Sequence, residues 1–204
     1  MGLSDAMIIP QYKSYFSQLI KVGFLPTKNV KVAWLGQQNP YERPLGNISM
    51  HSALQDFFDK SCSHDFYDIE NEKPWDAHGD WGKIEGYDIV LAIRINYLVP
   101  SVKHLLSETK KVIDNNNCLY ITDFCSGNIT KENNITWNEN SNNIIAYLPE
   151  YWPKHPNLVP SAKEDCILTK EKIEDAGLFL NLNRFSSFVC PKNRFNTICT
   201  LEKL

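Results

Sequence analysis

The sequence lacks the features that identify membrane proteins, secreted proteins and the common nucleotide-binding enzymes. Its 204 residues contain no apolar run near the roughly 20 residues that a membrane helix needs, and its N-terminus has no basic region followed by an apolar core. We therefore expect a cytoplasmic protein without a membrane anchor. The absence of a G-x-x-x-x-G-K-[ST] loop and of a complete G-x-G-x-x-G argues against binding of a nucleoside triphosphate or a nicotinamide cofactor.

Signals for metal and nucleic acid are missing as well. The six cysteines include no C-x-x-C pair and no zinc-like spacing with the five histidines, so we expect no metal site and reduced thiols. The formal charge of -3 is spread along the chain, and no basic surface indicates a nucleic-acid partner. Hydrophobic residues make up 43% and charged residues 22%, which is typical of a globular protein, and the length suits one domain.

What is present is an alternation of apolar strand-like runs and amphipathic helical segments. Helices are predicted over residues 10–25, 47–60, 100–114 and 169–177, with Thr169 as an N-cap and Gly177 as a stop. Strands are predicted over residues 30–35, 64–70, 87–95, 118–124, 184–190 and 195–204. This order predicts a parallel sheet with right-handed crossovers, and the last two strands suit an antiparallel hairpin.

Residues 125–165 differ in character from the rest of the chain. They are rich in asparagine and proline, with scattered aromatic residues. Structureless loops of this length are uncommon unless they are functional. We interpret this segment as a long ordered loop or lid insertion, whose aromatic side chains would cover an apolar acceptor or form a docking surface for another protein.

Two stretches carry a resemblance to a known family. One is "DAGL" followed by two strands that close with "NTICTLEKL"; the other is "GKIEGYDIVLAIRINYLVPSVKHLLSETKKVIDNNNCLYITDF". Together they resemble class I S-adenosylmethionine-dependent methyltransferases over residues 30–124 and 166–204. The resemblance implies an α/β fold, a Rossmann-like three-layer sandwich with a mostly parallel seven-stranded sheet closed by an antiparallel C-terminal strand. Residues 1–204 would form a single methyltransferase-like domain, with residues 1–29 as an N-terminal helical extension.

The resemblance also implies a cofactor, S-adenosylmethionine, lying across the carboxyl ends of the first strands. In open α/β sheets ligands bind where connections diverge to opposite faces. Gly36 and Gln37 match the position of the family's glycine-rich first motif, which is degenerate here because only one glycine is present. Pro40 and Pro44 remove two backbone donors from this loop. A strand that ends in an ordinary glycine turn is the alternative.

Asp68 and Glu70 follow the second predicted strand, where the family uses a carboxylate to accept from both ribose hydroxyls. A solvated acidic turn is the alternative. Asp68 precedes Tyr87 by only 19 positions, which leaves no room for a full helix and a third strand. Either the third strand is rudimentary, or residues 64–70 are themselves the third strand and the second is lost.

Two further positions are implied by the resemblance. In "HGDW", Asp80 would accept from the adenine amino group and Trp81 would lie against the purine ring. The alternative is a Gly-Asp turn followed by a tryptophan anchored in the core. Arg94 lies near the end of the strand predicted over residues 87–95, which resembles the family's fourth strand, where the family places residues that face both cofactor and substrate.

No catalytic residue can be assigned, because nothing selects among Tyr97, His104 and His155 as a base. Asp123 would either fix a loop or touch a substrate. The first hypothesis is methyl transfer from S-adenosylmethionine to a small-molecule or protein acceptor. The second is a catalytically silent methyltransferase-like domain that acts as a structural or protein-interaction module. A different nucleotide-handling α/β enzyme would explain "VAWLG" but not the closing hairpin.

Overall fold

The computed structural model describes residues 5–36, 50–69, 72–96, 99–128, 144–147, 167–190 and 194–204. Seven strands form the main sheet: β1 (Lys31–Leu35), β2 (Ser63–Asp68), β3 (Lys73–Pro74), β4 (Ile89–Ala92), β5 (Leu119–Asn128), β8 (Leu178–Cys190) and β9 (Arg194–Lys203). A separate antiparallel pair consists of β6 (Ile144–Tyr147) and β7 (Ile167–Thr169). The helices of the described residues are α1 (Asp5–Lys21), α2 (Met50–Gln55), α3 (Val102–Asn116) and α4 (Lys170–Asp175).

The strand order is β3-β2-β1-β4-β5-β9-β8. Neighbouring strands from β3 to β5 pair in parallel, whereas β9 is antiparallel to both β5 and β8. The predicted mostly parallel sheet, closed by an antiparallel C-terminal strand, is confirmed.

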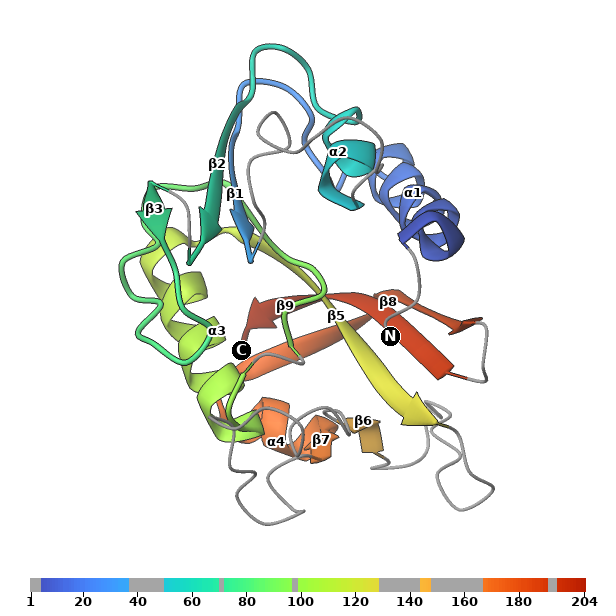
Figure 1. The fold of residues 1–204 in the computed structure, drawn as a ribbon, viewed down its shortest axis with the longest axis vertical. Helices are drawn as coiled ribbons and strands as arrows, with labels where there is room; N and C mark the ends of the chain where they lie inside the picture. Colours follow the sequence, from blue (N-terminus) through green and yellow to red (C-terminus); the bar gives the residue numbers. More distant parts are fainter. Residues whose placement is uncertain are drawn as a thin grey trace.

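Helices cover both faces of this sheet, which gives three layers (Figure 1). The side chains of β1 alternate between the two faces: Val32 and Trp34 pack in the hydrophobic cluster that contains α1 and α2, while Ala33 and Leu35 pack in the cluster that contains α3 and α4. Burial of both faces explains why this strand is a continuous apolar run rather than an alternating one.

Local capping signals act as the sequence predicts. The Thr169 hydroxyl accepts from the Lys172 amide at 3.2 Å, and Gly177 after α4 has a left-handed backbone with φ 73°. At α3 the cap is Ser101, which was not among the predicted caps: its hydroxyl accepts from the His104 amide at 3.0 Å, so this helix begins at Val102 rather than at residue 100. These caps fix where both helices begin.

Several predicted boundaries were wrong. The first helix begins at Asp5 rather than residue 10, because Pro10 is accommodated inside it. The second helix ends at Gln55 rather than residue 60. The strand predicted over residues 87–95 covers only Ile89–Ala92, since Arg94 has a left-handed backbone with φ 60° that cannot continue a strand.

The region after β2 shows which of the two alternatives for the third strand is correct. β3 contains two residues and pairs in parallel with the end of β2, so the third strand is rudimentary and residues 63–68 are the second strand. Strand β5 runs to Asn128, into the segment predicted as a long loop, and most of that segment lies outside the described residues. Within the described parts of the chain, no helix is both long and apolar enough to cross a bilayer.

Candidate functional site

The sheet has its topological switch point between β1 and β4. The chain proceeds from β1 outward to β2 and β3, then returns to place β4 on the other side of β1. Because β1 and β4 pair in parallel, the residues that follow them, Gly36 and Arg94, lie at the same edge of the sheet. In open α/β sheets this edge is where ligands bind. We use the name switch-point crevice for this edge of the sheet, where the residues Gly36 and Arg94 lie.

Gly36 occupies a position that only glycine fits. Its φ is 68°, and a Cβ atom there would lie 2.4 Å from Cγ2 of Ile95 and 3.4 Å from Cζ3 of Trp75. Ile95, just after β4, has no exposed surface. The space beside Gly36 is therefore filled by side chains of the protein itself. Gln37, the other residue of the predicted first motif, lies outside the described residues.

Trp75 is a site residue that the sequence reasoning missed. Its backbone amide donates to the Asp68 carbonyl at 3.1 Å, which ties the residue to the end of β2, and its ring lies against Gly36. Among the residues that the structure describes, the buried indole Nε1 has no hydrogen-bond acceptor. The only sequence signal for this residue was a tryptophan within a turn-rich segment. Asp68 itself is partly buried at the end of β2, and Glu70 lies outside the described part of the chain.

Asp80 and Trp81 lie in a loop that packs on α3. The Asp80 carboxylate accepts from the Gly82 amide and from the Lys111 ammonium, each at 3.0 Å, and these two contacts hold the pKa of Asp80 below its usual range. Trp81 is fully buried, its amide donates to the Glu108 carboxylate at 2.8 Å, and its ring centroid lies 5.1 Å from that of Trp75. Trp81 thus packs against Trp75 next to the switch-point crevice, whereas the Asp80 carboxylate binds Lys111 of α3.

A hydrogen-bond network fastens the backbone after β4. The Arg94 amide donates to Oδ1 of Asp123 at 2.6 Å, and the Tyr12 hydroxyl of α1 donates to Oδ2 of the same carboxylate. The Asn96 side-chain amide donates to the Thr122 hydroxyl at 3.0 Å and to the Asp123 carbonyl. Asn96 Oδ1 is buried and has no donor within the described ranges. Asp123 therefore fixes this loop, one of the two roles that the sequence left open.

Of the three candidate bases, His104 alone lies within the described residues. His104 of α3 contacts the Ala77 carbonyl at 3.1 Å through Nε2, and its ring meets the Trp81 ring edge-on, so it packs within the structure. Tyr97 and His155 lie outside the described residues. Over the described residues there is also no group of three or more histidine, cysteine and acidic side chains that could hold a metal ion.

The comparisons with known proteins give matches only among solved structures. No protein-family model matches the chain, and no curated protein matches its sequence. A possible exported protein from Bordetella parapertussis is 12% identical over 96% of this chain and 68% of its own, with a TM-score of 0.46. A chain of the complex between the Haloferax volcanii Trm112 methyltransferase activator and the putative methyltransferase is 11% identical over 97% of this chain and 93% of its own, with a TM-score of 0.46.

The trans-methyltransferase CalH, in complex with SAH, is 12% identical over 87% of this chain and 52% of its own, with a TM-score of 0.45. Such identities and TM-scores do not establish a family or an activity, and the fold assignment rests on the strand order and directions. By that order the chain is a Rossmann-like sandwich with the sheet arrangement of class I S-adenosylmethionine-dependent methyltransferases.

Proposed function

We propose that the switch-point crevice binds S-adenosylmethionine and that the protein transfers the cofactor's methyl group to a small-molecule or protein acceptor. The observation that carries this proposal is the pair of buried polar atoms next to the switch point, Trp75 Nε1 and Asn96 Oδ1, which have no partner among the described residues. Leaving such an atom unpaired costs about 1–3 kcal/mol, which a bound ligand would offset. S-adenosylmethionine offers both acceptors and donors, so this pair fits it.

The remaining residues of the crevice would bind and orient this ligand. Asp68, at the end of β2, presents a carboxylate that accepts two hydrogen bonds at once, as two ribose hydroxyls require. Left-handed Gly36 ends β1 at the same edge of the sheet. When bound, the cofactor supplies an activated methyl group. The contribution of the chain is to hold donor and acceptor in line.

A second candidate function is supported by Ile95. Its side chain fills the space beside Gly36 and leaves no exposed surface, as expected of a packed core rather than an open cofactor loop. A domain of this kind would be catalytically silent and would act as a structural or protein-interaction module.

Calorimetric titration with S-adenosylmethionine and S-adenosylhomocysteine tests the proposal. We expect micromolar binding to the wild-type protein and a loss of about tenfold or more in Asp68→Asn, because hydrogen bonds to a charged group are worth about 1.5–3 kcal/mol. Glu85→Gln is the matched control, since it makes the same charge change at an exposed residue ahead of β4. If Asp68→Asn binds both ligands as tightly as the wild type does, Asp68 is not the residue that accepts hydrogen bonds from the ribose hydroxyls.

Ile95→Ala separates the two candidate functions. If the wild-type protein gives no heat at millimolar ligand while Ile95→Ala binds, then Ile95 closes the crevice and the silent module is the better account. If neither protein gives heat although both unfold cooperatively, the cofactor proposal fails.

A further inference from the structure

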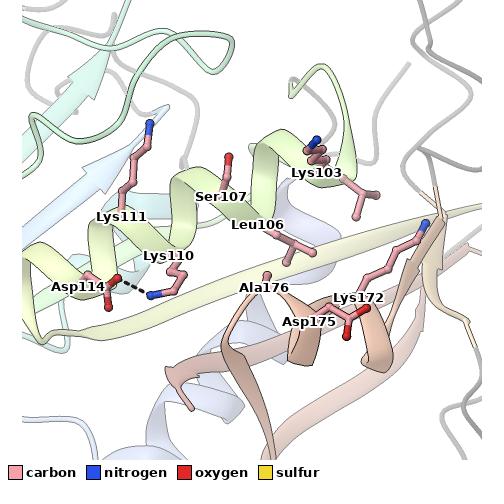
Figure 2. Close-up of a pocket in the computed structure, with 10 residues that line it drawn as sticks. Lys103, Leu106, Ser107, Lys110, Lys111, Asp114, Lys172, Asp175 and Ala176 are labelled. Carbon is pink, nitrogen blue, oxygen red and sulfur yellow. Dashed lines mark hydrogen bonds and ion pairs between the residues drawn. The ribbon is translucent and has the colours of Figure 1, made fainter.

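Two clusters of charged side chains lie on the face of the sheet that α3 and α4 cover. In the groove between these helices Lys110 pairs with Asp114, which joins two turns of one helix (Figure 2). The second cluster joins separate elements at the β3 edge of the sheet: Asp65 and Tyr67 of β2, Lys73 of β3 and Tyr87 ahead of β4. The second cluster therefore ties strands together, and we call it the β3 clamp.

The Tyr87 hydroxyl is the centre of the β3 clamp. It donates to Oδ2 of Asp65 at 2.6 Å and accepts from the Lys73 ammonium at 3.2 Å. Because the single proton of this hydroxyl goes to Asp65, Tyr67, whose hydroxyl lies 2.8 Å away, must donate to the Tyr87 oxygen. Tyr87 is 6% exposed, and its amide donates to the Asn116 side chain of α3 at 3.0 Å. The β3 clamp is therefore anchored in the packed part of the molecule.

The Lys73 ammonium is held by a carboxylate and by two aromatic rings. It pairs with Asp65 at 2.6 Å, and it lies 5.6 Å from the ring centroid of Tyr67 and 5.9 Å from that of Tyr87. A cation within about 6 Å of a ring centroid is attracted by the ring. The Lys73 side chain is nevertheless 45% exposed, so its ion pair adds little to the global stability. We therefore expect its effect to be local.

The strand that carries Lys73 is the shortest described strand of the main sheet. β3 contains two residues, which pair with the end of β2, and one of them is Pro74, which has no N–H to donate. The next residue, Trp75, continues the ladder with an amide that donates to the Asp68 carbonyl at 3.1 Å. Side chains alternate along a strand, so Lys73 and Trp75 point to the same face. Lys73 enters the β3 clamp there, and Trp75 packs beside Gly36.

We propose that Lys73 is a positioning residue for the switch-point crevice: its ammonium, fixed by Asp65 and Tyr87, holds β3 on β2 and so keeps the Trp75 indole against Gly36. Lys73 acts through Trp75 and not by contact with a ligand. The consequence for ligand affinity rests on the proposed cofactor function, whereas the effect on β3 does not.

Hydrogen exchange of the Trp75 backbone amide tests the β3 clamp in the ligand-free protein, because this amide bonds to Asp68 and is released when β3 opens. Lys73→Met keeps the apolar stem and removes the ammonium. We expect the Trp75 amide to exchange about two- to fivefold faster, the range typical of exposed ion pairs. The Leu119 amide, which donates to the Asp88 carbonyl at 2.9 Å, should keep its wild-type exchange rate.

Three further variants complete the exchange experiment. Lys73→Arg should restore the wild-type rate, since a guanidinium also pairs with a carboxylate. Tyr87→Phe removes the centre of the β3 clamp and should also accelerate exchange of the Trp75 amide, and its effect should not multiply with that of Lys73→Met. Lys60→Met is the matched control at an exposed residue ahead of β2, and it should change nothing.

Two results of the exchange experiment would overturn the proposal. One is a Trp75 exchange rate that Lys73→Met leaves unchanged or alters no more than Lys60→Met does. The other is equal acceleration at Trp75 and Leu119, because the effect of Lys73 would then be global rather than local to β3.

Calorimetric titration with S-adenosylhomocysteine tests the consequence for the switch-point crevice. Lys73→Met should bind about two- to fivefold more weakly than the wild type, and Lys73→Arg should bind as the wild type does. If the wild type binds and Lys73→Met binds equally well, Lys73 does not position the crevice and the proposal is overturned. If the wild type does not bind, the cofactor proposal fails, while the exchange rates still decide whether Lys73 holds β3.

Discussion

Replacing Gly36 by alanine tests how tightly the end of β1 is packed. The new methyl group would lie 2.4 Å from Cγ2 of Ile95, a fully buried side chain, so the core must shift to admit it. Overpacking of this kind typically costs about 1–3 kcal/mol. The left-handed backbone at φ 68° adds about 1–2 kcal/mol for any residue with a Cβ atom. We expect Gly36→Ala to lower the free energy of unfolding by about 2–5 kcal/mol.

Gly23→Ala is the matched control for this substitution. Gly23 has a similar φ of 72°, but nothing lies within 4 Å of the position of its missing Cβ atom. It therefore reports the backbone cost alone, about 1–2 kcal/mol. The difference between the two variants isolates the contact with Ile95.

Equilibrium unfolding in urea provides the free energies for both variants. In the double variant Gly36→Ala/Ile95→Ala, the methyl group of one substitution enters the space vacated by the other. Its destabilisation should thus be smaller than the sum of the two single effects by about 1–3 kcal/mol. The reasoning is refuted if Gly36→Ala costs no more than Gly23→Ala, or if the two single effects are additive.

Three further outcomes follow from the hydrogen bonds. Burial lowers the pKa of His64, whose Nδ1 accepts from the Trp34 indole at 3.0 Å. Because the unfolded chain therefore binds a proton at a higher pH than the folded protein does, the free energy of unfolding should fall as the pH drops below about 6.5. Urea titrations at several pH values measure this dependence, which His64→Gln should reduce. Tyr12→Phe removes a donor from the buried Asp123 carboxylate and should cost about 1.5–3 kcal/mol of unfolding free energy. Tyr15→Phe loses a hydrogen bond to a backbone carbonyl and should cost only about 0.5–1.5 kcal/mol. If Tyr12→Phe and Tyr15→Phe cost the same, the Tyr12 hydroxyl does not donate to a charged carboxylate.

The elements of the fold were predictable where the signal is local. The run from Val32 to Leu35 is apolar because both of its faces are buried, and a short run of this kind that ends at a glycine indicates a central parallel strand. The Thr169 cap and the Gly177 stop likewise depend on neighbouring residues only. The end of β4 was not predictable, because Arg94 leaves the strand conformation where its amide meets Asp123 of β5.

The candidate site depends on contacts between residues that are distant in sequence. Tyr12 and Asp123 are 111 positions apart, and no periodicity pairs them. A glycine after a strand indicates a close approach, but the sequence does not reveal that Ile95 and Trp75 make that approach. Asp80 occupies a motif-like position, and its ion pair with Lys111 follows from how the loop folds back on α3.

The most direct test of the central claim is the indole N–H signal of Trp75 in a ¹⁵N–¹H correlation spectrum during titration with S-adenosylhomocysteine. Trp75→Phe assigns this signal. The Trp34 indole is the internal reference, because its N–H already donates to His64. If the switch-point crevice binds the cofactor, the Trp75 signal should shift saturably while the Trp34 signal stays in place. A Trp75 signal that does not move at millimolar S-adenosylhomocysteine would contradict the account.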